Sequence, residues 1–165
     1  MNQKVPDENL FVEQIIELPF TESAGHYISK FLTKIRDEGK ITANKCPKCH
    51  RIVLPPRIVC AFCKVEIEDK PENWVELPDK GTVTECMGID DREVDAVTGE
   101  FIGTLNPNLF VRLDGGDKWT IRAHIAEETD ASKYPPGARV QAVWKPQKER
   151  VGKMSDIRFF RLIKE

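Results

Sequence analysis

The chain has 165 residues, of which 40 % are hydrophobic and 32 % are charged, and its net charge is −2. This length suits one ordinary domain or two small ones, and the charge excludes a strong overall attraction to nucleic acid. No run approaches the roughly 18 apolar residues of a membrane-spanning helix, and the start lacks the basic stretch and apolar block of a secretory signal. We therefore expect a cytoplasmic protein with no membrane partner.

The first 39 residues predict a tail followed by an amphipathic helix. Residues 1–18 are expected to form a tail that packs little against the rest of the protein. Apolar residues then recur at spacings of three and four, which places them on one face of a helix: Tyr27, Ile28, Phe31, Leu32 and Ile35. Thr21 or Ser23 is expected to cap this helix, with Glu22 in its first turn. Gly39 suits its end.

Residues 40–75 predict a metal module, because they hold four of the five cysteines in two CxxC pairs. The pairs are Cys46–Cys49 and Cys60–Cys63, and DKPENW at 69–74 indicates a polar linker after them. Two CxxC turns joined by a short hairpin bring four thiolates into a tetrahedron that Zn²⁺ accepts at bonds of ~2.3 Å. In a cytoplasmic protein such pairs bind metal more often than they form disulfides. Iron in a tetrathiolate cage has similar spacing and stays an alternative.

Four cysteine ligands leave no open position for water, so the predicted metal is structural, with one ion per chain. A thioredoxin-type redox pair is disfavoured, because two pairs with prolines between them do not start a helix in a βαβ unit. His50 adjoins Cys49 and is a weaker candidate ligand. Cys86 fits a small buried apolar residue better than a nucleophile. Known catalytic motifs such as a serine elbow or HExxH are lacking, so no catalytic residue is predicted.

From Trp74 onward the sequence is rich in β-branched and aromatic residues, which predicts strands. Five runs show partial alternation of apolar and polar residues: 82–89, 109–113, 119–125, 139–144 and 157–163. DGGD at 114–117 predicts a hairpin between the second and third runs, and residues 90–108 make a long connection between the first two. His124 in the third run is expected to face solvent or a partner. Five antiparallel strands within residues 76–165 predict a small closed barrel of the OB type.

Positive charge gathers before and within the cysteine module. Residues 30–64 hold nine lysines and arginines against Asp37 and Glu38, while the rest of the chain has a net negative charge. A basic segment on an acidic protein suggests a docking face for an anionic partner. A solvated surface that keeps a small domain soluble is an equally good interpretation.

Four stretches give the chain a resemblance to a known family. They are FLTKIRDEGKITANKCPKCHRIVLPPRIVCAFC (31–63), WVELPDKGTVTE (74–85), LFVRLDGG (109–116) and YPPGARVQAVW (134–144). Members of this family, long catalogued as a domain of unknown function, join a short helical segment to a rubredoxin-like zinc ribbon and an OB-fold. The resemblance implies a mainly β fold in three parts: a tail and helix over 1–39, a zinc ribbon over 40–75 and a five-stranded OB-fold barrel over 76–165.

The family resembled here accompanies thiolases and other acyl-CoA enzymes. The resemblance therefore implies a non-catalytic, zinc-containing small subunit, whose thiolase-fold partner supplies the cysteine nucleophile and histidine bases. The family's metal ligands map onto Cys46, Cys49, Cys60 and Cys63. Candidates for contacts to CoA, acyl-CoA or the partner come from the basic segment: Lys45, Lys48, Arg51 and Arg57. The long 90–108 connection departs from the family pattern.

Two other functions stay open at this point. OB-folds and zinc ribbons both occur in proteins that bind single-stranded nucleic acid. Bases would stack on aromatic residues that fit a core equally well: Trp119, Trp144, Phe159 and Phe160. The net negative charge of residues 65–165 opposes phosphate binding. A metal-stabilised adaptor with no link to acyl-CoA is the third possibility.

Overall fold

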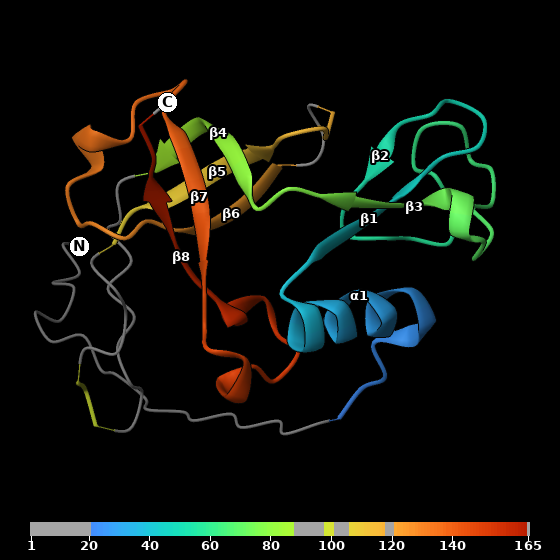
Figure 1. Cartoon of the computed structure of the whole chain (residues 1–165), viewed down its shortest axis with the longest axis horizontal. Helices are drawn as coiled ribbons and strands as arrows, with labels where there is room; N and C mark the ends of the chain where they lie inside the picture. The colour runs from blue at the N-terminus through green and yellow to red at the C-terminus, as the bar shows by residue number, and fades with distance from the viewer. Residues whose placement is uncertain (1–20, 88–97, 101–105, 118–120, 165) are drawn as a thin grey trace, which may run out of the picture.

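The computed structural model describes residues 21–87, 98–100, 106–117 and 121–164 (Figure 1). The predicted helix is confirmed as α1 (Gly25–Glu38), and Gly39 ends it in the left-handed region with φ 64°. The predicted start differs by one residue: Ala24 is the N-cap residue, without a side-chain cap bond, although the Ser23 hydroxyl accepts from the Gly25 N–H at 3.2 Å. Glu22 lies before the first turn and not in it. With no acid in its first turn, α1 depends on packing rather than on capping.

A small three-stranded antiparallel sheet follows α1, and the sequence patterns did not predict its strands. β1 (Ile41–Lys45) is central, between β2 (Ile52–Val53) and β3 (Trp74–Leu77). The segment 69–74 is not a plain linker: it contains the 3-10 helix η1 (Pro71–Asn73) and ends on the first residue of β3. The sheet therefore joins the start of the cysteine module to the chain that leads into the barrel (Figure 1).

Five further strands form a nearly closed barrel, which confirms the predicted fold class. They are β4 (Lys80–Met87), β5 (Asn108–Leu113), β6 (Ile121–Ile125), β7 (Arg139–Trp144) and β8 (Ile157–Leu162). Their order is β6-β5-β4-β7-β8, with every neighbouring pair antiparallel. The two edges meet where Ala126 bridges Phe160 and the Glu127 N–H donates to the Phe160 carbonyl at 2.9 Å. Three short 3-10 helices lie in the connections between barrel strands: η2 (Ala131–Lys133), η3 (Gln147–Glu149) and η4 (Met154–Asp156).

The predicted hairpin at 114–117 lies between β5 and β6, and an ion pair ties it to β7. Arg139 donates from both terminal nitrogens to the two carboxylate oxygens of Asp114, at 2.8 and 2.6 Å. This bidentate pairing holds the pKa of Asp114 below its usual range. Gly81 in β4 allows the strands to approach closely, because a Cβ there would lie 2.5 Å from the Arg112 carbonyl oxygen.

One apolar core runs through α1, the three-stranded sheet and the barrel. Phe31 and Ile35 of α1 are almost fully buried, as is Ile41 of β1. They belong to the same cluster as buried barrel residues such as Val83 and Val111. Phe31, Leu32 and Ile35 of the apolar stripe are therefore core, and burial of such side chains stabilises the fold at about 25 cal/mol per Å².

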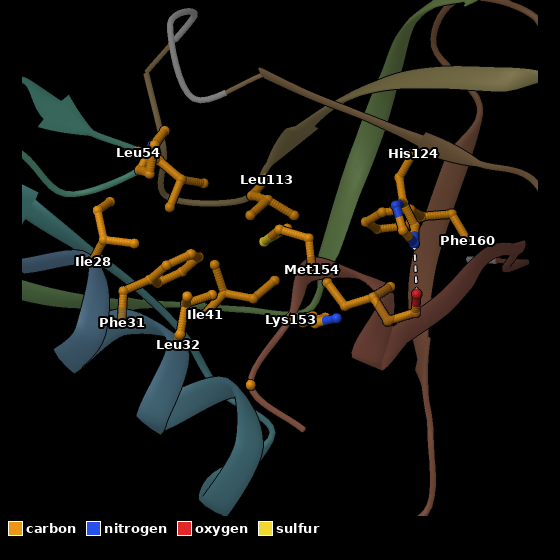
Figure 2. Close-up of a pocket in the computed structure, with 13 residues that line it drawn as sticks. Ile28, Phe31, Leu32, Ile41, Leu54, Leu113, His124, Lys153, Met154 and Phe160 are labelled. Atoms are coloured by element: carbon orange, nitrogen blue, oxygen red, sulfur yellow. Dashed lines mark hydrogen bonds between the residues drawn. The ribbon is translucent and has the colours of Figure 1, made fainter. Parts of the chain in front are cut away.

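A cavity of about 360 Å³ lies where α1, the three-stranded sheet and the barrel meet (Figure 2). His124 lines it, so the expectation that this side chain faces solvent or a partner is wrong. His124 pairs across the sheet with the fully buried Leu109, and cross-strand partners share one face. Its Nε2 lies 2.6 Å from the Ile157 carbonyl oxygen and donates to it, while burial lowers the pKa of the imidazole.

Of the aromatic residues considered for base stacking, Trp144, Phe159 and Phe160 are described, and all three are at least half-buried. Phe160 is 2 % exposed and belongs to the core. Trp144 is half-buried, and the guanidinium of Arg150 lies 5.5 Å from its ring centroid. Trp119 and most of the 90–108 connection lie outside the described residues. In the parts of the chain that the structure describes, no helix is long and apolar enough to cross a bilayer.

Candidate metal centre

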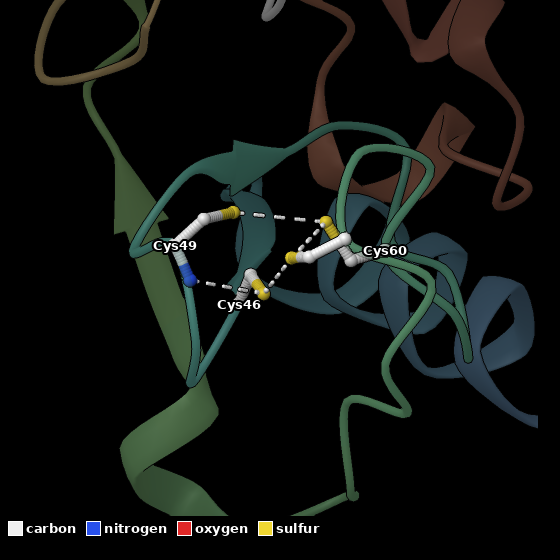
Figure 3. Close-up of side chains that lie close together, drawn as sticks. Cys46, Cys49 and Cys60 are labelled. Atoms are coloured by element: carbon white, nitrogen blue, oxygen red, sulfur yellow. Dashed lines mark hydrogen bonds between the residues drawn. The ribbon is translucent and has the colours of Figure 1, made fainter.

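The four cysteines of the two CxxC pairs come together in the ribbon (Figure 3). Their sulfur atoms all lie within 4.8 Å of one another. The Sγ–Sγ distances are 3.3 Å for Cys46–Cys63, 3.8 Å for Cys49–Cys60 and 3.5 Å for Cys60–Cys63. None of the four forms a disulfide, and Cys46 and Cys60 are fully buried. The structure thus gathers the predicted ligand set into one cluster.

The donor set fits a tetrahedral tetrathiolate site. Metal–sulfur bonds of ~2.3 Å imply edges of roughly 3.8 Å between sulfurs, close to the observed separations. Among the described residues this cluster contains cysteine alone, so His50 is not one of its donors. Four thiolates around one ion leave no position for water, and such a site holds a fold together rather than activating a nucleophile.

The two CxxC turns share one backbone design. In the first, the His50 N–H donates to the Cys46 carbonyl at 2.9 Å, and in the second the Lys64 N–H donates to the Cys60 carbonyl at 3.0 Å. Both donors adopt left-handed backbone angles, with φ 57° for His50 and 56° for Lys64. Such angles are uncommon outside glycine. Histidine is one of the residue types enriched at these angles, so the sequence gives a weak signal at His50 and none at Lys64.

Backbone N–H groups within the turns favour the thiolate form of Cys46 and Cys60. Burial alone would raise the pKa of Cys60, but hydrogen bonds from the N–H groups of Cys63 and Phe62 outweigh it and lower this pKa to about 6. The pKa of Cys46 is lowered by the same balance. Burial and the neighbouring sulfurs raise the pKa of Cys63 to about 12. A cation among the sulfurs would favour the thiolate at every position.

Asn44 holds the second cysteine turn against the sheet, a role that sequence reasoning missed. This β1 residue is fully buried. Its Nδ2 donates to the Arg57 carbonyl at 2.8 Å, and its Oδ1 accepts from the Arg57 N–H at 3.2 Å. The side chain therefore pairs like a backbone group with the loop that enters the second turn. The segment ITANK alternates apolar and polar residues, a pattern that would place Asn44 on the solvent side of a strand. Asparagine is also rare in strands, so the sequence contains no sign that Asn44 is buried.

We expect Asn44→Ala to destabilise the metal-loaded protein by about 2–4 kcal/mol, because the fully buried Asn44 amide is removed and the N–H and C=O of Arg57 both lose their partner. Urea unfolding monitored by circular dichroism measures the loss. Asn73→Ala is the matched control: it removes one hydrogen bond, from Nδ2 to the Glu68 carbonyl, and should cost about 1 kcal/mol. Equal losses for the two variants would contradict a special role for Asn44.

Asp69 connects α1, through hydrogen bonds and ion pairs, to the segment between the ribbon and the barrel. Its carboxylate lies 2.5 Å from Nε2 of His26 and accepts at 2.6 Å from both Lys30 Nζ and Trp74 Nε1. The hydrogen bonds from His26 and Lys30 hold its pKa well below the usual range. The Lys30 ammonium also lies 4.5 Å from the Trp74 ring centroid. This lysine of the basic segment is therefore engaged within the fold.

The four basic candidates, in contrast, have no carboxylate partner in the described parts of the chain. Residues 39–65 contain no acid, and the ion pairs of the described residues involve none of these candidates: Lys45, Lys48, Arg51 and Arg57. The Arg51 guanidinium lies 4.0 Å from the ring centroid of Phe62, which is 46 % exposed. Ile58 and Val59 are also exposed. The ribbon thus presents a surface that is both basic and apolar.

Cys86 stands apart from the metal cluster. It is half-buried in β4 and packs against the main core. Its Sγ lies 3.7 Å from the Ala131 carbonyl oxygen, and burial raises the pKa of the thiol. A raised pKa suits a packing residue and not an activated nucleophile.

Comparisons with known proteins point to one family. Residues 33–68 match the family model described as the ChsH2 rubredoxin-like zinc ribbon domain. A search of curated proteins gives no significant match. A chain in a solved structure described as "Ltp2-ChsH2(DUF35) aldolase" is 16 % identical at a TM-score of 0.53, over 86 % of this chain and 98 % of its own. A DUF35-family protein of unknown function from Sulfolobus solfataricus is 21 % identical at a TM-score of 0.47, covering 81 % of each chain. The resemblance to zinc-ribbon and barrel proteins is confirmed.

Proposed function

We propose that this chain, whose residues 33–68 match the model of the ChsH2 rubredoxin-like zinc ribbon domain, is a non-catalytic small subunit of an acyl-CoA enzyme complex. The observation that carries this proposal is the closed cluster of four cysteines, which is built to hold a fold and not to react. A chain of the same fold occurs in a structure named as an aldolase with two components, Ltp2 and ChsH2. That likeness supports association with a catalytic partner.

Zinc is the metal that this proposal assigns to Cys46, Cys49, Cys60 and Cys63. Soft thiolates in a tetrahedral set select zinc, or iron in a similar cage. The ion, when bound, supplies rigidity to a ribbon whose own core contains only three fully enclosed residues: Cys46, Cys60 and Ile67. The protein's part is to hold the four sulfurs in place through its two turns.

The partner in this proposal is a larger thiolase-fold chain in the cytoplasm. It supplies the cysteine nucleophile and histidine bases for carbon–carbon cleavage or formation, and this chain supplies a scaffold. Lys45, Lys48, Arg51 and Arg57 contact the phosphates of CoA or an acidic face of the partner. Their lack of internal carboxylate partners in the described residues supports this role, because an unpaired cation is available to an external anion.

Co-expression with candidate thiolases, followed by native mass spectrometry and elemental analysis, tests the proposal. The expected result is a hetero-oligomer that contains zinc, while the purified chain alone has no thiolase activity. Turnover by the isolated chain would overturn the non-catalytic assignment. Failure to associate with any acyl-CoA enzyme encoded beside it would favour the adaptor interpretation instead.

Reversal of charge at two exposed ribbon positions, Lys48→Glu with Arg57→Glu, should weaken association with the partner or with CoA by about tenfold. Each rim charge is worth up to about 1 kcal/mol, and opposite charge also steers the encounter. Isothermal titration calorimetry at low and physiological salt measures the change. The matched control reverses two exposed barrel lysines, Lys148→Glu with Lys164→Glu, and should bind as the unaltered protein does. If both pairs of substitutions weakened binding equally, the loss of affinity would be an effect of net charge and not of the ribbon surface.

A further inference from the structure

The cavity between α1, the ribbon and the barrel is walled almost entirely by hydrocarbon (Figure 2). Ile28, Phe31 and Leu32 of α1 form one wall, and Leu54 closes a second from the loop between the cysteine pairs. The barrel supplies the third through residues that include Leu113 and Phe160. A volume of about 360 Å³ falls within the 300–1,000 Å³ that is usual for small-molecule sites.

Among the described residues, two side chains with polar ends line this cavity. His124 is one, and its Nε2 is already occupied by the Ile157 carbonyl. Lys153 is the other, and Figure 2 shows its nitrogen below Met154, at the edge of the group of lining side chains. No ion pair in the described residues involves Lys153, whose side chain belongs to an exposed residue of the rim. A ligand body thus meets apolar groups inside and one positive charge at the edge.

The rim is built rigidly, so the cavity exists before any ligand arrives. The buried carboxylate of Asp156 accepts hydrogen bonds from the N–H groups of Val151, Gly152 and Lys153, at 2.7–3.2 Å. Gln147 Nε2 donates to the Asp37 carbonyl at 3.0 Å and ties the same region to the end of α1. A preformed site binds without the cost of ordering a loop.

We propose that this cavity binds a medium-length alkyl carboxylate, with the hydrocarbon chain among Phe31, Leu113 and Phe160 and the carboxylate beside Lys153. A methylene takes about the ~30 Å³ that a water molecule takes in the liquid, so the cavity holds on the order of ten carbons. An uncharged end group would forgo the ion pair with the Lys153 ammonium at the exposed rim, and a longer polar body would leave its own polar atoms unpaired inside. This proposal does not depend on the proposed partnership with an acyl-CoA enzyme.

Calorimetric titration of the full-length, metal-loaded chain with decanoate, below its micelle concentration, tests the proposal. The expected result is saturable binding of one decanoate per chain. The uncharged match 1-decanol should bind about five- to tenfold more weakly, since it lacks the ion pair at the rim. Decanoyl-CoA carries the same hydrocarbon chain but ends it in an uncharged thioester. Its affinity, compared with that of decanoate, therefore shows whether the cavity prefers a free carboxylate or an acyl thioester. Tighter binding of decanoyl-CoA than of decanoate would overturn the carboxylate assignment.

Two pairs of variants locate the ligand. Met154→Trp fills the cavity and should abolish binding, while Met87→Trp, at a 50 % exposed position outside the cavity, should not. Lys153→Glu should weaken decanoate binding about five- to tenfold and leave 1-decanol unchanged, while Lys148→Glu should change neither. Decanoate binding that survives Met154→Trp would overturn the proposal. So would the absence of binding by the folded chain, which would assign the cavity to an apolar side chain of a partner or to the chain's first 20 residues.

Discussion

Replacement of Cys60 by serine should release the metal and unfold the ribbon. Metal binding contributes about 10–16 kcal/mol in zinc-finger peptides. The cluster around the sulfurs has only three fully enclosed residues, Cys46, Cys60 and Ile67, which cannot replace that contribution. We expect the metal content to fall close to zero by elemental analysis. Limited proteolysis should then cut between residues 46 and 67, before any cut within the barrel strands.

Cys86→Ser is the control for this loss, because it removes a thiol that lies outside the cluster. It should retain the metal and the protease resistance of the ribbon. A Cys60→Ser variant that keeps a full complement of metal would contradict a four-cysteine site. The same elemental analysis decides between zinc and iron in the unaltered protein, which share this donor set.

Asp156→Ala should cost about 3 kcal/mol or more, the second-largest effect expected of a single substitution. The carboxylate is fully buried and accepts from the N–H groups of Val151, Gly152 and Lys153. Truncation leaves these donors without their partner, and hydrogen bonds to a charged group are the stronger kind. Asp156→Asn keeps one acceptor and should lose about half as much. Thermal and urea unfolding measure both variants, and losses below 1 kcal/mol would contradict this role.

The same carboxylate makes stability depend on pH. Burial opposes ionisation of Asp156, but the backbone hydrogen bonds outweigh it and lower its pKa in the folded chain. An unfolded aspartate titrates near about 3.9. The stabilisation is therefore complete above roughly pH 5 and is lost as the pH falls through the folded pKa. The stability difference between the unaltered protein and Asp156→Asn should shrink below about pH 4, and a constant difference down to pH 2 would contradict it.

Patterns with a short range in the sequence predicted the parts of the fold that depend on them. The apolar stripe of Tyr27 to Ile35 predicted α1, since a helix repeats every 3.6 residues. The two CxxC pairs predicted a cluster of four sulfurs, since each turn is local. The five barrel strands lie within two residues of the predicted runs, because half-buried strands alternate in polarity.

Features that depend on tertiary contacts were not predicted. β2 has only two residues, too few for a pattern, and β1 buries the polar side chains of Thr42 and Asn44 together with its apolar ones, so it is not a half-buried strand. His124 was assigned to the wrong face, because its position follows from pairing with Leu109 across the barrel. The cavity was also missed, since its walls come from segments that are far apart in the chain. The N-cap position at Ala24 was also missed, since alanine is not a preferred capping residue.

The shared core of α1, β1 and the barrel determines how the chain can be divided. Ile41 and Ala43 of β1 are buried against α1 and the barrel, while the same strand leads directly to Cys46. A ribbon excised after Leu77 would turn that apolar surface toward water. The metal module therefore cannot be moved to another protein by itself. A chimaera that contains it must also contain α1 and an apolar barrel surface that matches it.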